Sequence, residues 1–188
     1  MENKKLNVLH VSQQYPCGTD FYGIFVKHTI DALSKKINCT LISPKPLVLP
    51  FKFFPYHKFF YIPPKEKTKK YTIHYPRYLY PIPDRGILKR MFYHLVGFFY
   101  RLSVIPYIKK NIKKPDIIHA HFAYPDAFAM LPIKKYWGVP MVIHLRGILM
   151  EKIVFEWPRT AAKIKQAFRD SELIIANNHE LKERFLKL

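Results

Sequence analysis

The chain has 188 residues, 49% of them hydrophobic and 16% aromatic, and a formal net charge of +19. The length fits one domain, 1–188, and the apolar content excludes intrinsic disorder. No charge-free run reaches the roughly 18 residues of a membrane-spanning helix, the N-terminus does not resemble a signal peptide, and two cysteines are too few for a disulfide scaffold. These features predict a reduced, cytoplasmic chain, and they leave the charge to be explained.

The positive charge is concentrated in one basic segment, residues 44–114. It holds 16 Lys and Arg and two acids, a net charge of +14, whereas the rest of the chain carries +5. Nine of the 16 prolines lie between Pro44 and Pro83, and eight Phe and eight Tyr lie between Phe51 and Tyr100. Because aromatic side chains favour burial or an interface, this segment suits nucleic acid, an anionic membrane or a polyanionic ligand. An ordinary Lys-rich surface is the plainer alternative.

The predicted elements alternate between short apolar runs and helical patterns. In chain order they are a strand at Leu6–Ser12, a helix at Ile24–Lys36, strands at Cys39–Ser43 and Thr72–Tyr75, a helix from Ile87, a strand at Asp116–Phe122, a helix at Pro125–Tyr136, a strand at Met141–Leu145, a helix at Arg159–Arg169, a strand at Glu172–Ala176 and a helix at His179–Leu188. Pro76 limits the third strand to an edge or an end of the sheet, and Asn178 suits the N-cap of the last helix. The alternation predicts a Rossmann-like, doubly wound α/β fold with a mainly parallel sheet and helices on both faces.

The helix from Ile87 carries one apolar stripe at spacings of three and four. The stripe consists of Leu88, Met91, Leu95, Phe98, Leu102 and Ile105. Such a stripe packs against the core more often than it faces a membrane, so core packing is the favoured interpretation and a membrane face the alternative.

Ligands of such sheets bind at the carboxyl ends of the strands, so the residues that follow each strand are the candidate site residues. Gly23 directly precedes a helix whose N-terminus could receive an anion, although a plain turn explains it equally well. Neither GxGxxG nor GxxxxGK[ST] occurs, which disfavours a dinucleotide site and excludes a P-loop.

The run HAHFAYPDAF places His119 and His121 on one face of a strand. His119, in the interior of the strand, is predicted to be a hydrogen-bonded core residue. His121 and Asp126 could orient or abstract a hydroxyl proton, and helix capping is the alternative for Asp126.

The run IHLRG places Arg146 at the same edge, where it suits a phosphate, a carboxylate or a surface salt bridge, and Gly147 lets a loop approach closely. No metal site is expected, because the two histidines lack a third ligand at zinc-like spacing. Cys17 reads as an unreactive thiol.

Taken together, the motifs VLHVSQQYP, YGIFVKHTIDAL, PDIIHAHFAYPDAFAM, GVPMVIHLRG and SELIIANNHELKERFLKL resemble the N-terminal, acceptor-side domain of family 4 glycosyltransferases, which have the GT-B fold. The resemblance implies a retaining enzyme that uses a nucleotide-sugar co-substrate and needs no metal or tightly bound cofactor. It places Gly23 near the donor diphosphate. Arg146 stands where the family often has a histidine beside the transferred sugar, which puts that histidine's role in doubt.

The resemblance also implies that the C-terminal donor-binding domain is absent from these residues, as in a fragment or a split enzyme. The leading hypothesis is the acceptor-binding domain of a glycosyltransferase that acts on a lipid-linked or cell-surface glycan at the inner membrane face. There His121 or Asp126 would contact sugar or acceptor, and Arg146 a phosphate or sugar. The alternatives are a basic nucleic-acid-binding module, disfavoured because no such motif is present, and a non-catalytic subunit of a split enzyme.

Overall fold

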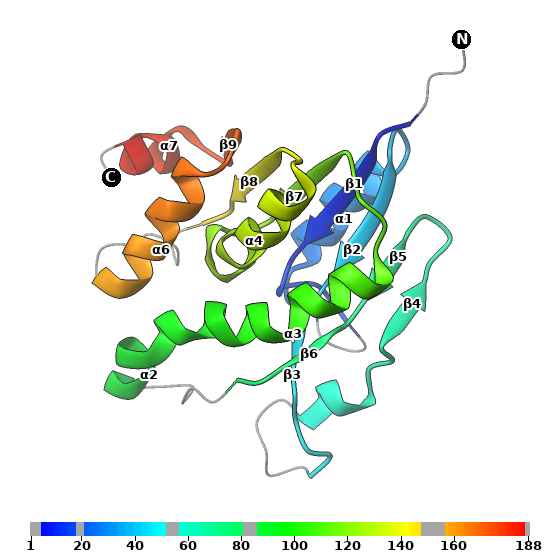
Figure 1. Ribbon diagram of the computed structural model, residues 1–188, viewed down its shortest axis with the longest axis horizontal. Coiled ribbons are helices and arrows are strands. Elements are labelled where there is room, and N and C mark those ends of the chain that lie inside the picture. The colour runs from blue at the N-terminus through cyan, green and yellow to red at the C-terminus, as the bar shows by residue number, and fades with distance from the viewer. Residues whose placement is uncertain (1–4, 18–20, 52–56, 81–85, 148–156, 187–188) are drawn as a thin grey trace.

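The computed structural model describes residues 5–17, 21–51, 57–80, 86–147 and 157–186. Its main feature is a seven-stranded sheet with the order β4-β5-β2-β1-β7-β8-β9 (Figure 1). The strands are β1 (Asn7–Val11), β2 (Asn38–Ile42), β4 (Lys65–Lys67), β5 (Thr72–His74), β7 (Ile117–Ala120), β8 (Met141–Leu145) and β9 (Leu173–Ala176). Every neighbouring pair is parallel except β4 and β5.

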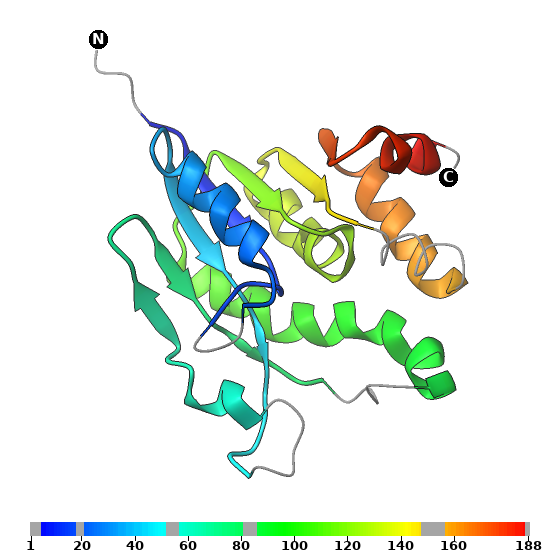
Figure 2. The ribbon, with the colours of Figure 1, turned by 180° about the vertical axis from the view of Figure 1, so that it is seen from behind.

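Helices lie on both faces of the sheet. Figure 2 shows α1 in front of the strands, with α3 on the far side. The described helices are α1 (Ile24–Leu33), α2 (Gly86–Phe92), α3 (Val96–Asn111), α4 (Phe128–Trp137), α6 (Pro158–Arg169) and α7 (His179–Leu186). Short turns at Tyr93–Leu95 and Ala123–Ala127 lead into α3 and α4. The predicted doubly wound, mainly parallel fold is therefore confirmed.

The predicted elements agree closely with the observed ones outside the basic segment. The strand at Met141–Leu145 has the predicted bounds, and the backbone N–H of Leu181 donates to Asn178 Oδ1 at 2.7 Å, which confirms the N-cap of α7. β5 ends two residues before Pro76, and β4 pairs on its outer side, so Pro76 marks a strand end. The sequence did not predict β4 or the small pair β3 (Lys45–Pro46) and β6 (Arg77–Tyr78).

The basic segment is built into the core, with four of its tyrosines buried: Tyr71, Tyr75, Tyr78 and Tyr100. It supplies β5 to the sheet and α3 to one of its faces. The segment therefore carries the charge on a structural part of the domain.

The favoured interpretation of the helical stripe was wrong for four of its six residues. Leu88, Met91, Phe98 and Leu102 are all about half exposed, between 49% and 57%. The buried face of α3 is instead formed by Val96, Gly97, Tyr100, Val104 and Ile108. Both sets recur at helical spacing, and the tyrosine-lined interior receives the second one. Among the described residues no helix is long and apolar enough to cross a membrane.

Candidate functional site

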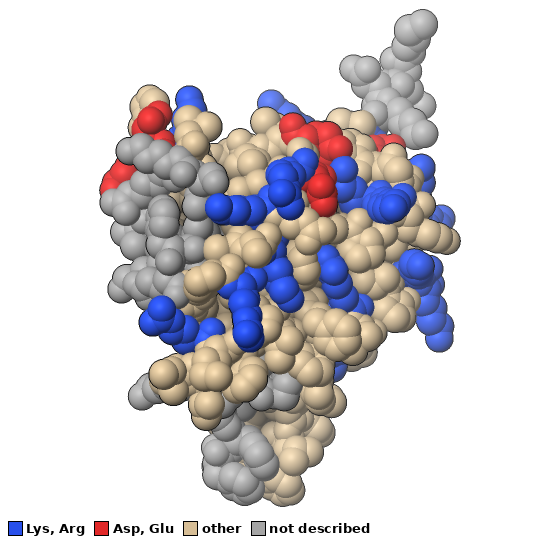
Figure 3. All heavy atoms as spheres, turned by 60° about the vertical axis from the view of Figure 1, so that its left-hand side comes forward, with Lys and Arg blue, Asp and Glu red and all other residues tan. Residues whose placement is uncertain are grey.

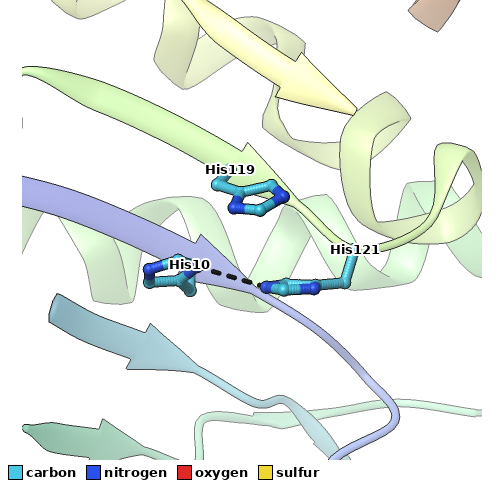
Figure 4. Close-up of side chains that lie close together, drawn as sticks. All are labelled: His10, His119 and His121. Carbon is cyan, nitrogen blue, oxygen red and sulfur yellow. Dashed lines mark hydrogen bonds between the residues drawn. The ribbon is translucent and has the colours of Figure 1, made fainter. Parts of the chain in front are cut away.

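Four histidines gather at the carboxyl ends of three adjacent strands. His10 lies on β1, His119 on β7, His121 just beyond it, and His144 on β8. The register pairs His10 with His119 across β1 and β7. Figure 4 shows the rings of His10, His119 and His121 close together, and those of His119 and His121 stack with centroids 4.4 Å apart. The prediction that His119 and His121 share one face is thus confirmed.

Arg146 joins this group from the residue after β8. Its Nη2 lies 2.9 Å from His121 Nδ1, 3.0 Å from His144 Nδ1 and 3.0 Å from Thr29 Oγ1 of α1. The guanidinium also lies 5.2 Å from the ring centre of Phe25, so this group faces the α1 side of the sheet. Burial lowers the pKa of Arg146 to about 10, which leaves it charged at neutral pH.

The partners of Arg146 are neutral groups. Its hydrogen-bond partners are two imidazoles and a hydroxyl, and the ion pairs found in the described ranges involve other residues. Burial lowers the pKa of His121 well below its usual value, and the nearby His119, His10 and Arg146 lower it further. The site therefore holds a positive charge without a carboxylate counter-ion in the described part of the chain, which suits an anionic ligand.

The structure adds a third potential metal ligand, His10, to the two histidines that the sequence analysis considered. One ring nitrogen each of His10, His119 and His121 lies within 4.8 Å of the others, close enough for a metal ion. A zinc ligand must offer a lone pair, and the second nitrogen of a ligating histidine usually donates to an acceptor. Here His121 Nδ1 faces Arg146, which can only donate, so the nitrogen of His121 that faces His10 carries the proton. This arrangement does not favour a metal, and the absence of a metal requirement stays a prediction.

Asp126 lies in the interior, near the end of the turn Ala123–Ala127 that leads into α4. Its Oδ1 accepts hydrogen bonds from the backbone N–H of Gln13 at 3.1 Å and from the Tyr100 hydroxyl at 2.9 Å. Burial raises the pKa of Asp126 to about 7, and these two hydrogen bonds oppose the rise. Asp126 thus ties the loop after β1 to α3, while His121 is held by other partners.

Gly23 occupies a position that only glycine fits well. Its φ is +83°, and a Cβ there would lie 2.4 Å from the carbonyl oxygen of Gln14. The close approach packs the start of α1 against the loop that follows β1. Gly147 follows Arg146 at the same edge, and a Cβ there would meet nothing within 4 Å.

A largely apolar groove lies away from these residues. It has a volume of about 770 Å³ between β9, α6 and α7, and Leu145 is the part of its lining closest in sequence to Arg146. None of the four histidines lines it. The chemistry of the site therefore rests on the charged and polar group at the ends of β1, β7 and β8.

Solved structures show which fold this is. The N-terminal domain of a Candida albicans trehalose-6-phosphate phosphatase matches with a TM-score of 0.63 at 13% identity, covering 100% of this chain and 44% of that one. UGT71G1 of Medicago truncatula, complexed with UDP-glucose, matches with a TM-score of 0.57 at 12% identity, covering 98% of this chain and 48% of that one. UGT89C1 of Arabidopsis thaliana, complexed with UDP-L-rhamnose, matches with a TM-score of 0.58 at 12% identity, covering 97% of this chain and 45% of that one. The fold is the Rossmann-like layer of GT-B glycosyltransferases.

The family follows from the sequence match. Residues 23–188 match the model of Glycosyltransferase Family 4, and the chain belongs to that family. A Bacillus subtilis (strain 168) relative, named for teichuronic acid biosynthesis (glycosyltransferase TuaC), is 30% identical over 87 residues, which is 46% of this chain and 22% of the relative. The chain spans less than half the length of the solved chains and of this relative.

The sequence reasoning missed His10 and Thr29 as members of the site. His10 stands in an apolar run and Thr29 within a helical pattern, and although both lie inside motifs that carry the family resemblance, nothing in those motifs singles them out as site residues. The signal becomes readable only with the strand order, which places β1 beside β7 and brings His10 next to residues more than 100 positions away.

Proposed function

We propose that this chain is the acceptor-binding domain of a nucleotide-sugar-dependent glycosyltransferase that acts at an anionic membrane surface. The observation that carries the proposal is the family match over residues 23–188, on a fold whose solved relatives include proteins complexed with UDP-sugars. The acceptor would be a lipid-linked or cell-surface glycan. The teichuronic acid name of the Bacillus subtilis relative agrees with this acceptor class.

Within the site, we assign the direct contact with a donor phosphate or sugar to Arg146. It is half-buried and charged, whereas His121 and Asp126 are fully buried. A direct contact of either with a sugar would require neighbouring side chains to move. Gly23, at the positive end of α1, and Gly147, beside Arg146, would line the donor side, where a diphosphate meets backbone N–H groups.

The membrane part of the proposal rests on α2 and α3. Their exposed Leu88, Met91, Phe98 and Leu102 lie on helices that carry Lys89 and Arg90 and, between residues 86 and 111, no acid. Figure 3 shows a neighbouring face on which Lys and Arg clearly outnumber Asp and Glu. Apolar side chains flanked by cations can enter the headgroup region of an anionic membrane.

Vesicle co-sedimentation tests the membrane part with a matched pair of variants. Leu102→Ser removes an exposed apolar contact on α3 and is expected to reduce binding to phosphatidylserine vesicles while leaving the far-UV spectrum unchanged. Leu6→Ser, at an exposed position before β1, is the control and should bind like the unaltered chain. If the unaltered chain ignores anionic vesicles and instead binds oligonucleotides with a steep salt dependence, the nucleic-acid alternative replaces this proposal.

Calorimetric titration tests the donor part. We expect the chain to bind inorganic pyrophosphate and UDP, and Arg146→Gln to weaken both by about tenfold or more, since a charge-assisted hydrogen bond is lost. Equal affinity of Arg146→Gln and the unaltered chain would contradict the assignment.

A further inference from the structure

We propose that His121 and His10 are positioning residues that hold the Arg146 guanidinium at the carboxyl edge of the sheet through one ordered chain of hydrogen bonds. The chain runs from Arg146 Nη2 to His121 Nδ1 at 2.9 Å, and from His121 Nε2 to His10 Nδ1 at 3.2 Å. Figure 4 shows the second of these contacts as the dashed line between the two rings.

Which atom donates in each of these hydrogen bonds follows from the chemistry of arginine. A guanidinium has five N–H donors and no acceptor, so the ring nitrogen that it meets must present a lone pair. In neutral His121 the proton then sits on Nε2, and that N–H donates to His10 Nδ1. His10 in turn carries its proton on Nε2, which is buried and has no hydrogen-bond partner in the described structure. One donor therefore sets the tautomer of two buried rings.

A second branch holds the same nitrogen. Arg146 Nη2 also lies 3.0 Å from His144 Nδ1, and His144 Nε2 lies 2.6 Å from Asn177 Oδ1. The same rule makes His144 the Nε2–H tautomer, which donates to the Asn177 oxygen. Thr29 Oγ1, whose own proton faces the Phe25 carbonyl at 2.9 Å, is left to accept from Arg146. The Nη2 nitrogen has only two protons for these three acceptors, so its position is set by all of them together.

Neutral acceptors on three sides have a consequence for binding. A carboxylate would fix the guanidinium equally well and would cancel its charge, whereas imidazole and hydroxyl fix it and leave the charge for a ligand. The titratable groups around His121 supply no negative charge. They are His10 on β1, His119 on β7, and His144 and Arg146 at the end of β8. These hydrogen bonds thus hold the Arg146 side chain in place before an anion binds, which lowers the entropy cost of ordering that side chain on binding.

The proton order can be measured on the unaltered chain. Ring-nitrogen NMR spectra of ¹⁵N-histidine-labelled protein at pH 7.5 distinguish the two tautomers and the charged form. We expect Nε2–H tautomers for His10, His121 and His144. In Arg146→Met we expect His121 to show a mixture of the two tautomers. An Nδ1–H tautomer or a charged ring at His121 in the unaltered chain would overturn the proposal.

A pair of variants separates positioning from general packing. An Asn side chain can place its oxygen near the Nδ1 position of histidine, whereas Gln reaches toward Nε2. His121→Asn keeps the acceptor for Arg146 and is expected to retain pyrophosphate affinity within about threefold, whereas His121→Gln should lose about tenfold or more. Equal losses in both variants would mean that His121 acts only through packing.

This second experiment rests on the proposed phosphate contact, and the first does not. If pyrophosphate fails to bind the unaltered chain, the phosphate role of Arg146 fails, and the NMR spectra still decide the proton order. If pyrophosphate binds but the tautomers differ from those stated, the positioning chain fails and the proposed function stands.

Discussion

The backbone of Gly23 lies so close to the Gln14 carbonyl that a Cβ on Gly23 would stand 2.4 Å from that oxygen. Because the neighbour is backbone and φ is +83°, Gly23→Ala combines a strained conformation with a contact that cannot relax by rotation of a side chain. We expect a loss of about 2 kcal/mol or more in the free energy of unfolding, measured with urea. Gly138→Ala is the control, since φ there is +61° but a Cβ meets nothing within 4 Å, and about 1 kcal/mol is expected.

Asp126 should make stability fall as the pH rises. Its carboxyl group has a pKa of about 7 in the folded chain and 3.8 in the reference state, so between these values the folded form keeps a proton that the unfolded form has lost. The stabilisation present below pH 4 is therefore lost by about pH 7. Asp126→Asn lacks this loss, and its stability relative to the unaltered chain should improve by an amount on the order of 4 kcal/mol across that window. A pH-independent difference would contradict the buried, protonated carboxyl group.

His119 should have the opposite effect in nearly the same range. Burial, followed by the charges of His144 and Arg146, lowers the pKa of His119 to about 4, so the unfolded chain takes up a proton at a pH where the folded chain does not. The stabilisation is present above pH 6.5, the ordinary pKa of histidine, and is lost as the pH falls toward 4. His119→Gln should therefore lose less stability on acidification than the unaltered chain, by an amount on the order of 3 kcal/mol. His28→Gln, which removes an exposed imidazole on α1, is the matched control, and the same change of acid dependence in both variants would contradict a special role of the buried ring.

The basic residues of α2 should contribute to membrane affinity through charge. Each Lys or Arg near an anionic surface contributes about 1 kcal/mol, so loss of the two charges alone weakens binding about 30-fold. The double variant Lys89→Glu/Arg90→Glu also adds two carboxylates that the surface repels, so it should bind phosphatidylserine vesicles at least about 30-fold more weakly. Lys35→Glu/Lys36→Glu makes the same charge change at exposed positions after α1 and serves as the control. If both double variants weaken binding equally, net charge explains the interaction and α2 has no special part in it.

Most strands could be predicted because they are short apolar runs between polar breakers, as at Met141–Leu145, where prediction and structure coincide. The outward stripe of α3 could not be assigned, because Val96, Tyr100, Val104 and Ile108 repeat every four residues beside it and periodicity alone does not say which stripe meets the core. The choice depends on tertiary packing, here on Gly97, whose missing side chain admits the rings of Tyr124 and Phe128.

The candidate site was predictable in part for a similar reason. Residues that follow a strand, such as His121 and Arg146, were found by position, and the structure joins these two directly at 2.9 Å. Their roles in catalysis stay predictions. The pairing of His121 with Asp126 was a guess from closeness in sequence, whereas the actual partners, His10 and Tyr100, come from β1 and α3, and only the folded chain brings them there.

The two outer strands of the described sheet have opposite chemical character. β4 is antiparallel to its neighbour and reads Lys-Glu-Lys, so its outer edge is charged and resists pairing with another strand. β9 is parallel and exposes Leu173, Ile174 and Ile175. Because a charged edge disfavours pairing and an apolar one favours it, we expect any further strand, including one from a second copy at high concentration, to add at β9 rather than at β4.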